Sequence, residues 1–153
     1  MEQVRFRGRS PLSDPYFSSL NETVTVSIAE LLMLNQMRIL CTPAVIDNTP
    51  TCGNQEDYVA MGYNAAKKSL AVAEKLEYIL AIELLSVYEA QPFVDGRLRR
   101  SSASRQVLTE ISKEVPDMKE DMYLYPHIEF LRRKIHDGSL VRWAETGMGK
   151  KLV

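Results

Sequence analysis

The stretch from Asp57 to Ala90 constrains the fold of this chain more than any other feature. It contains no proline, Gly62 is its only glycine, and apolar side chains recur at steps of three and four residues. That spacing predicts one long amphipathic helix. Its roughly 34 residues, at 1.5 Å each, would extend about 50 Å. A compact chain of 153 residues is only about 30 Å across, so the helix would project from it.

The C-terminal half of this stretch predicts an assembly of helices. Residues 78–85 are apolar on nearly every side of the helix, with Glu83 as the exception. A helix of that kind is buried all round, but one small domain cannot cover a rod that projects from it. We therefore expect partner helices from other chains, in a homo-oligomer or a hetero-oligomeric complex built as a multi-helix bundle.

A further helix is predicted before the long one. Asn21 is an N-cap type of residue, and the helix is expected to run from there to about Cys41, where Pro43 ends it. Residues 23–26 are β-branched, which leaves a short strand open for the first turn.

The last third of the chain is predicted to be a helical appendage. Ser101 or Ser102 can cap a helix that reaches Pro116, and Pro126 can open a helix that ends at Gly138. The fold class is therefore all-α, a long-helix bundle with a small helical appendage. The expected organisation is an irregular lead-in over 1–20, a helical domain over 21–141 and a flexible tail over 142–153.

Composition and charge argue against several kinds of partner. The formal net charge is −1, which gives no reason to expect nucleic acid or an anionic membrane surface. No apolar run approaches the ~20 residues of a membrane span, and the basic residues near the start are followed by no apolar leader stretch. Cys41 and Cys52 form no CxxC pair and are typical of reduced thiols in a cytoplasmic protein.

Four polar residues, Asn54-Gln55-Glu56-Asp57, stand at the expected start of the long helix. The free backbone N–H groups of a helix start make it a place where polar side chains can line a site. A carboxylate such as Glu56 could bind an amine or imidazole there, or assist proton transfer. Alternatively, Glu56 and Asp57 are first-turn acids that compensate the helix dipole.

Separated motifs follow one another between about Ser27 and Val141. They are Thr42-Pro43-Ala44, Asp47, Pro50-Thr51 and Asn54-Gln55-Glu56-Asp57, then Leu80-Ala81-Ile82-Glu83-Leu84-Leu85, and finally Val115-Pro116, Asp121, Tyr123-Leu124, Pro126, Ile128-Glu129 and Gly138-Ser139-Leu140-Val141. In this order they resemble the C-terminal part of the histidine ammonia-lyases, within the aromatic amino acid lyase and aminomutase family.

The resemblance implies a catalytic role for Glu56 and substrate-binding roles for Asn54 and Gln55. In histidine ammonia-lyases the matching glutamate lies in the active site, whereas relatives that act on phenylalanine or tyrosine tend to carry an amide there. Glu56 therefore favours histidine, converted to urocanate with loss of ammonia. Tyr58 stands where a histidine is usual and Ala60 where a serine is common, which leaves tyrosine and phenylalanine open as substrates.

The family reaction also implies a cofactor, methylidene-imidazolone (MIO), which forms from an internal Ala-Ser-Gly tripeptide. This chain has none, since Ala103-Ser104 is followed by Arg105. We expect the chain to be inactive alone and MIO to come from a partner chain that carries the lyase N-terminal half. The alternative is a non-catalytic helical oligomerisation module derived from such a lyase.

Other residues carry weaker signals. Glu83 is either a site carboxylate or the partner of an Arg or Lys on a neighbouring helix. His127 and His136 have no further ligand at metal spacing, so no metal is assigned. Cys52 has no recognisable base nearby. The arginines of residues 97–105 would either grip a phosphate or form a solvated surface.

Overall fold

The structure, a computed structural model, describes residues 15–46, 48–95, 97–116 and 122–152, with helical side chains from Ile28 onward apart from Phe93. No strand occurs among these residues, and the prediction of an all-α fold is confirmed. The elements are α1 (Pro15–Leu40), α2 (Gly62–Glu89), the short 3₁₀ helix η2 (Gln91–Phe93), α3 (Ser102–Ile111), α4 (Tyr125–His136) and α5 (Ser139–Met148).

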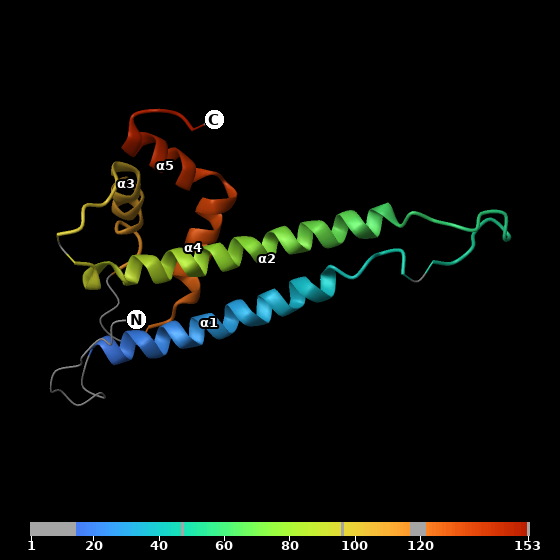
Figure 1. Cartoon of the computed structure of the whole chain (residues 1–153), viewed down its shortest axis with the longest axis horizontal. Coiled ribbons are helices and arrows are strands. Elements are labelled where there is room, and N and C mark those ends of the chain that lie inside the picture. Colours follow the sequence, from blue (N-terminus) through green and yellow to red (C-terminus); the bar gives the residue numbers. More distant parts are fainter. Residues whose placement is uncertain (1–14, 47, 96, 117–121, 153) are drawn as a thin grey trace.

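Helices α1 and α2 lie side by side and antiparallel, and together they form a long rod (Figure 1). The connection between them extends beyond the rod at one end (Figure 1). Lys68 Nζ donates to the Thr42 carbonyl at 2.8 Å, and Lys75 Nζ donates to Gln36 Oε1 at 2.5 Å. These bonds join α2 to the C-terminal part of α1 and to the first residues of the connection that follows it.

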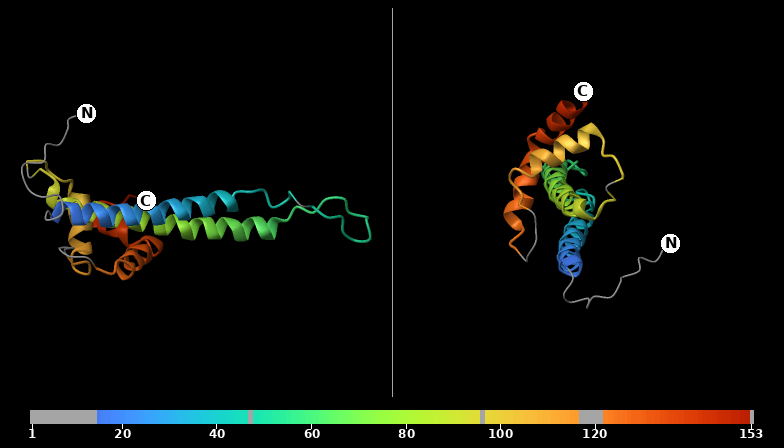
Figure 2. Two further views of the ribbon diagram at one scale, coloured as in Figure 1. Left: turned by 90° about the horizontal axis from the view of Figure 1, so that it is seen from below. Right: turned by 90° about the vertical axis from the view of Figure 1, so that its left-hand side faces the viewer.

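Helices α3, α4 and α5 gather at the opposite end of the rod, around the C-terminal half of α2 (Figure 2). Their shared core consists of side chains from three helices and the segment that follows α3. Its fully buried members are Ala81, Leu85, Ile111, Val115 and Leu131. Tyr88 of α2 links this core to the segment after α3, because its hydroxyl donates to the Val115 carbonyl at 3.0 Å.

The C-terminal half of α2 is covered only in part by its own chain. Ala81, Ile82 and Leu85 are buried, whereas 41% of Leu80 remains exposed. Ile82 is therefore buried by this chain itself, and no partner chain is needed to cover it. Toward the other end of α2, 69% of Leu70 is exposed.

The starts of the first two helices differ from the sequence-based expectation. Helix α1 begins at Pro15, six positions before Asn21, and residues 15–20 are therefore helical. Proline suits the first turn of a helix because its fixed φ is helical and its missing N–H would be unpaired there. Helix α2 begins at Gly62 because Met61, in the left-handed region at φ 48°, separates it from residues 58–60, which form no regular secondary structure.

The predicted flexible tail is wrong over most of its length. Residues up to Met148 form α5, which packs against α3. Gly147 allows this approach, because a Cβ at that position would lie 2.5 Å from the Ser102 carbonyl oxygen. The glycine is thus a packing residue. Both predicted helices of the appendage are present, although α3 ends at Ile111 and does not reach Pro116. Ser101 is the N-cap of α3, and its side chain accepts from the Ser104 amide.

Candidate functional site

The connection between α1 and α2 folds as a hairpin-like loop at the far end of the rod (Figure 1). Its tip is closed by two backbone hydrogen bonds. The Thr51 amide donates to the Glu56 carbonyl at 3.0 Å, and the Glu56 amide donates to the Thr51 carbonyl at 3.3 Å. This pair is an isolated antiparallel bridge, and it brings residues five positions apart face to face.

The turn inside this bridge uses left-handed backbone. Cys52, Gly53 and Asn54 have φ values of 54°, 66° and 68°. Glycine and asparagine tolerate this region better than other residues, so the Gly53-Asn54 sequence suits it. Cysteine does not tolerate this region as well, so the Cys52 backbone is strained, and the Thr51–Glu56 bridge that encloses the turn holds it in place.

A side chain closes the base of the loop. Asn48 Nδ2 donates to the Val59 carbonyl at 2.8 Å, and the Val59 amide donates to Asn48 Oδ1 at 3.2 Å. The amide group of Asn48 thus pairs with Val59 as a backbone peptide group would. Both bonds are partly buried, which limits the competition from water.

Glu56 lies on the exposed tip of this loop, beside Asn54 and Gln55, which are also exposed. Its carboxylate accepts a hydrogen bond from Thr51 Oγ1 at 3.3 Å. The expectation that these residues sit at a helix start is wrong, because α2 begins six residues after Glu56. Glu56 and Asp57 therefore cannot compensate the dipole of α2 as first-turn acids, since the helix dipole acts on charges only within the first turn of a helix.

Two grooves lie along the rod, and neither is lined by Asn54, Gln55 or Glu56. One, of about 430 Å³, lies where the rod meets the loop and includes Lys67 and Asn64. The other, of about 380 Å³, lies between α1 and α2. The three candidate site residues are therefore presented on a projection of the rod, outside both grooves.

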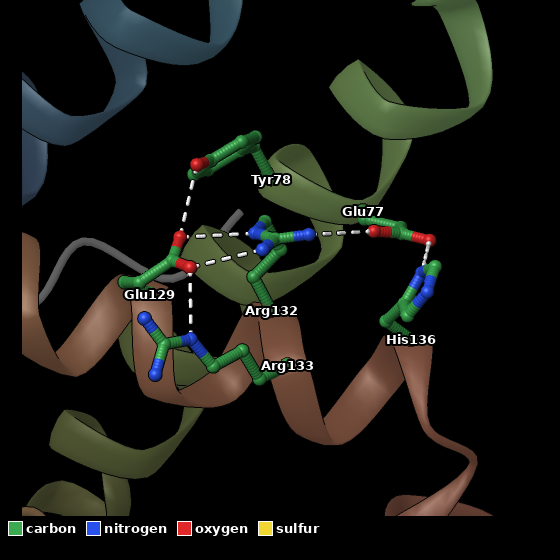
Figure 3. A network of polar contacts seen from close by, with 6 residues as sticks. All are labelled: Glu77, Tyr78, Glu129, Arg132, Arg133 and His136. Atoms are coloured by element: carbon green, nitrogen blue, oxygen red, sulfur yellow. Dashed lines mark hydrogen bonds and ion pairs between the residues drawn. The ribbon is translucent and has the colours of Figure 1, made fainter. Parts of the chain in front are cut away.

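A second polar cluster joins α2 to α4, and it was not singled out from the sequence (Figure 3). Arg132 bridges both helices: its Nη2 lies 2.9 Å from Glu129 Oε1, and its Nη1 lies 3.1 Å from Glu77 Oε2. Tyr78 donates to Glu129 Oε2 at 2.9 Å, and His136 Nδ1 lies 2.7 Å from Glu77 Oε1. The Glu-x-x-Arg-Arg spacing on α4 was the available signal.

This cluster works as a clasp. Hydrogen bonds from Arg132, and then from Arg133 and Tyr78, lower the pKa of Glu129 from 4.5 to about 2 despite the opposing effect of burial. Burial, together with the bond to Glu129, raises the pKa of Tyr78. Glu129 therefore stays ionised and Tyr78 protonated near neutral pH, so that α4 is held on α2 by fixed charges. We assign the cluster a structural role.

The structure gives no evidence of a binding site at the other described residues that the sequence suggested as candidates. Glu83 is exposed, and no Arg or Lys among the described side chains forms an ion pair with it, so this chain does not supply the basic partner considered for it. It lies near Glu30, whose pKa is raised first by burial and then by the charge of Glu83. Arg97 pairs with Asp95 at 2.6 Å on an exposed loop. Within the described ranges, His, Cys, Asp and Glu form no group of three that could hold a metal.

The helices of the described residues include none that is long and apolar enough to cross a membrane.

Comparisons with known proteins agree on one family. The family model for aromatic amino acid lyases matches residues 12–113. Histidine ammonia-lyase from Symbiobacterium thermophilum is 37% identical over 117 residues, covering 76% of this chain and 23% of that enzyme. The histidine ammonia-lyase of Caenorhabditis elegans is 32% identical over 118 residues, which are 76% of this chain and 17% of that enzyme.

A solved structure shows the same similarity in space. The crystal structure of histidine ammonia-lyase from Trypanosoma cruzi superposes with a TM-score of 0.69 and 26% identity. The match covers 76% of this chain and 23% of that chain. The matched part of this chain thus spans only 17–23% of the length of these enzymes.

Proposed function

This chain belongs to the aromatic amino acid lyase family, and we propose that it supplies the C-terminal helical part of an ammonia-lyase. The reaction would be the non-oxidative elimination of ammonia from an L-amino acid, with histidine, giving urocanate, as the favoured substrate. The observation that carries this proposal is the loop of residues 48–59, which holds Glu56 in a fixed register on a projection of the rod.

Glu56 is chemically suited to recognise an imidazole. Its carboxylate is exposed, and its one described side-chain bond, from Thr51 at 3.3 Å, is long. Enclosure by a complementary surface would remove water and strengthen any contact with a polar, titratable ring. A carboxylate gains nothing of this kind from an apolar ring, so Glu56 selects histidine over phenylalanine. Asn54 and Gln55, on the same turn, are proposed to complete the substrate contacts through their amide groups.

The residues of this chain do not fit the cofactor of the family. Ala103-Ser104-Arg105 is its nearest sequence to Ala-Ser-Gly, and Arg105 replaces the glycine. This segment also lies in the first turn of α3, where the Arg105 amide donates to the Ser101 carbonyl at 3.0 Å. We therefore propose that MIO belongs to a complementary part of the lyase, carried by a partner chain.

The exposed rod supports an assembly of that kind. Large aliphatic side chains of α1 are open to solvent, including Leu31 at 63% and Leu32 at 62% exposure. Leu70 of α2, at 69%, is equally open. Each such side chain gains roughly 1.5–3 kcal/mol when it is buried. Contacts with other copies of this chain, or with the complementary part, would cover these helices in a multi-helix bundle.

Complementation tests this function. The chain would be produced alone and together with a lyase N-terminal part that contains Ala-Ser-Gly, and ammonia release from histidine, tyrosine and phenylalanine would be measured. We expect no turnover by the chain alone and turnover of histidine by the combined preparation. Turnover by the verified single component would contradict the assignment of MIO to a partner.

The second candidate function is a non-catalytic assembly module. The exposed rod and the missing tripeptide favour it equally well. The same complementation distinguishes the two functions. A combined preparation that forms a stable complex carrying MIO but releases no ammonia would favour the module.

A further inference from the structure

Asn48 lies outside the group of residues that the family resemblance singles out as contacting substrate. We propose that it is a positioning residue, which fixes Glu56 through the backbone of the loop. This inference rests on the proposed function, because it gives Asn48 a part in the same reaction. Asn48 touches Val59 and does not touch Glu56, so its effect must pass along the chain.

The register of the loop supports this role. Thr51 pairs with Glu56, and Asn48 pairs with Val59 three positions further along each arm. Both pairs therefore obey one antiparallel register. Across the described intervening positions no backbone hydrogen bond joins the arms, and Pro50 has no N–H to donate. The Asn48 side chain supplies the pairing that the backbone lacks.

The Thr51–Glu56 backbone pair fixes the tip of the loop, but the direct support for the Glu56 side chain is weaker. Thr51 Oγ1 bonds the carboxylate directly, but at 3.3 Å and in an exposed setting. Water competes well for a bond of that kind. The two bonds of Asn48 are partly buried, and one of them is 2.8 Å long. Because both bonds are shielded from water, the pair holds the loop more firmly than the Thr51 hydroxyl holds the carboxylate.

Loss of the Asn48 bonds would free the base of the loop. The backbone between residues 48 and 59 would then sample other conformations, since left-handed turns are not favoured on their own for Cys52. Glu56 would leave its position for a fraction of the time. In an enzyme, a displacement of that kind lowers the rate more than it lowers stability.

Amide hydrogen exchange on the chain alone tests the structural half of the proposal. Asn48→Ala should speed exchange of the Val59 amide by at least about fivefold, the equivalent of one lost hydrogen bond, and should leave the amides of α2 unchanged. Asn64→Ala is the matched control, because Asn64 is exposed in the first turn of α2. Unchanged exchange at Val59 in Asn48→Ala would overturn the inference about Asn48 without touching the proposed function.

A double-mutant cycle in the complemented enzyme tests the functional half. Asn48→Ala should lower turnover of histidine by about tenfold when Glu56 is present, and by less than about threefold when Glu56→Gln is already in place. Equal losses in both backgrounds would show a general structural effect and overturn the positioning role. An unchanged rate for Glu56→Gln alone would overturn the proposed function, and the role of Asn48 in the reaction would fall with it.

Discussion

The two ends of α2 are built differently. Its C-terminal half packs against α4 and contributes Ala81 and Leu85 to a closed core, and the clasp around Arg132 seals the contact. Among the described helices, its N-terminal half lies beside α1; it leaves Leu70 exposed and follows the Glu56 loop. The C-terminal half thus helps to form a core within this chain, although Leu80 stays 41% exposed, whereas the N-terminal half presents apolar surface and leads to the candidate site residues. The difference indicates where a partner would bind.

The largest effect should come from removing a core side chain at the closed end. Leu131→Ala should lower the free energy of unfolding by about 2–5 kcal/mol, because it opens a cavity in a fully buried cluster. The matched change Leu70→Ala, at an exposed position, should stay within about 0.5 kcal/mol. Urea denaturation of both variants measures this contrast. Equal losses would show that the rod end is as tightly packed as the core.

The clasp should give the next largest effect. Arg132→Met leaves Glu77 and Glu129 without their bridging partner and should cost about 2 kcal/mol. Arg133, with 71% of its side chain exposed, is the control, and Arg133→Met should cost at most about 0.5 kcal/mol. Similar costs for both variants in urea denaturation would argue against a clasp.

The same cluster predicts a dependence on pH. Because the pKa of Glu129 is lower in the folded chain than its ordinary 4.5, its contribution is present above pH 4.5 and is lost as the pH falls toward 2. Wild-type chain should therefore lose more stability over this range than Arg132→Met. Urea denaturation at several pH values would show parallel losses if the clasp were unimportant.

Gly147 offers a smaller change at the closed end. Gly147→Ala would push α5 away from Ser102 and Gln106, at a cost of roughly 1–3 kcal/mol. Gly62→Ala, where an added Cβ meets nothing within 4 Å, should be neutral or slightly stabilising. Thermal unfolding of the two variants distinguishes a packing glycine from a permissive one, and a harmless Gly147→Ala would restore the interpretation of α5 as a loose tail.

The sequence predicted the helices of the fold more accurately than the local structure around the candidate site residues. The periodic apolar positions of α2 and α4 predicted those helices because burial fixes their spacing. The start of α2 was placed too early, since the turn from Cys52 to Asn54 and the Asn48–Val59 pair depend on contacts that propensity does not report. Residues 142–153, with Gly147 among them, were expected to form a flexible tail, because a close approach of α3 and α5 leaves no local pattern in the sequence.

We call the N-terminal half of α2, the adjoining part of α1 and the Glu56 loop the open end of the rod. A charge introduced on the apolar surface of this end should weaken assembly with little change in stability. Ile39→Lys, near the C-terminal end of α1 and at a position with 64% exposure, should weaken association at least about tenfold and change the free energy of unfolding by less than about 0.5 kcal/mol. Lys67→Glu, also exposed, is the control and should do neither. Light scattering over a dilution series measures association. A stable monomer of 17.4 kDa at high concentration would show that the rod needs no second copy of the chain.

The most direct test of the open end is the rate of urocanate formation by the complemented enzyme with Glu56→Gln. We expect turnover of histidine to fall at least about tenfold, on the order of 1.4 kcal/mol of transition-state stabilisation. Folding and assembly should be unchanged, because an amide keeps the shape of the exposed loop. Glu114→Gln, an exposed change outside the loop, should retain full activity. An unaltered rate for Glu56→Gln would contradict the assignment of Glu56 to the active site.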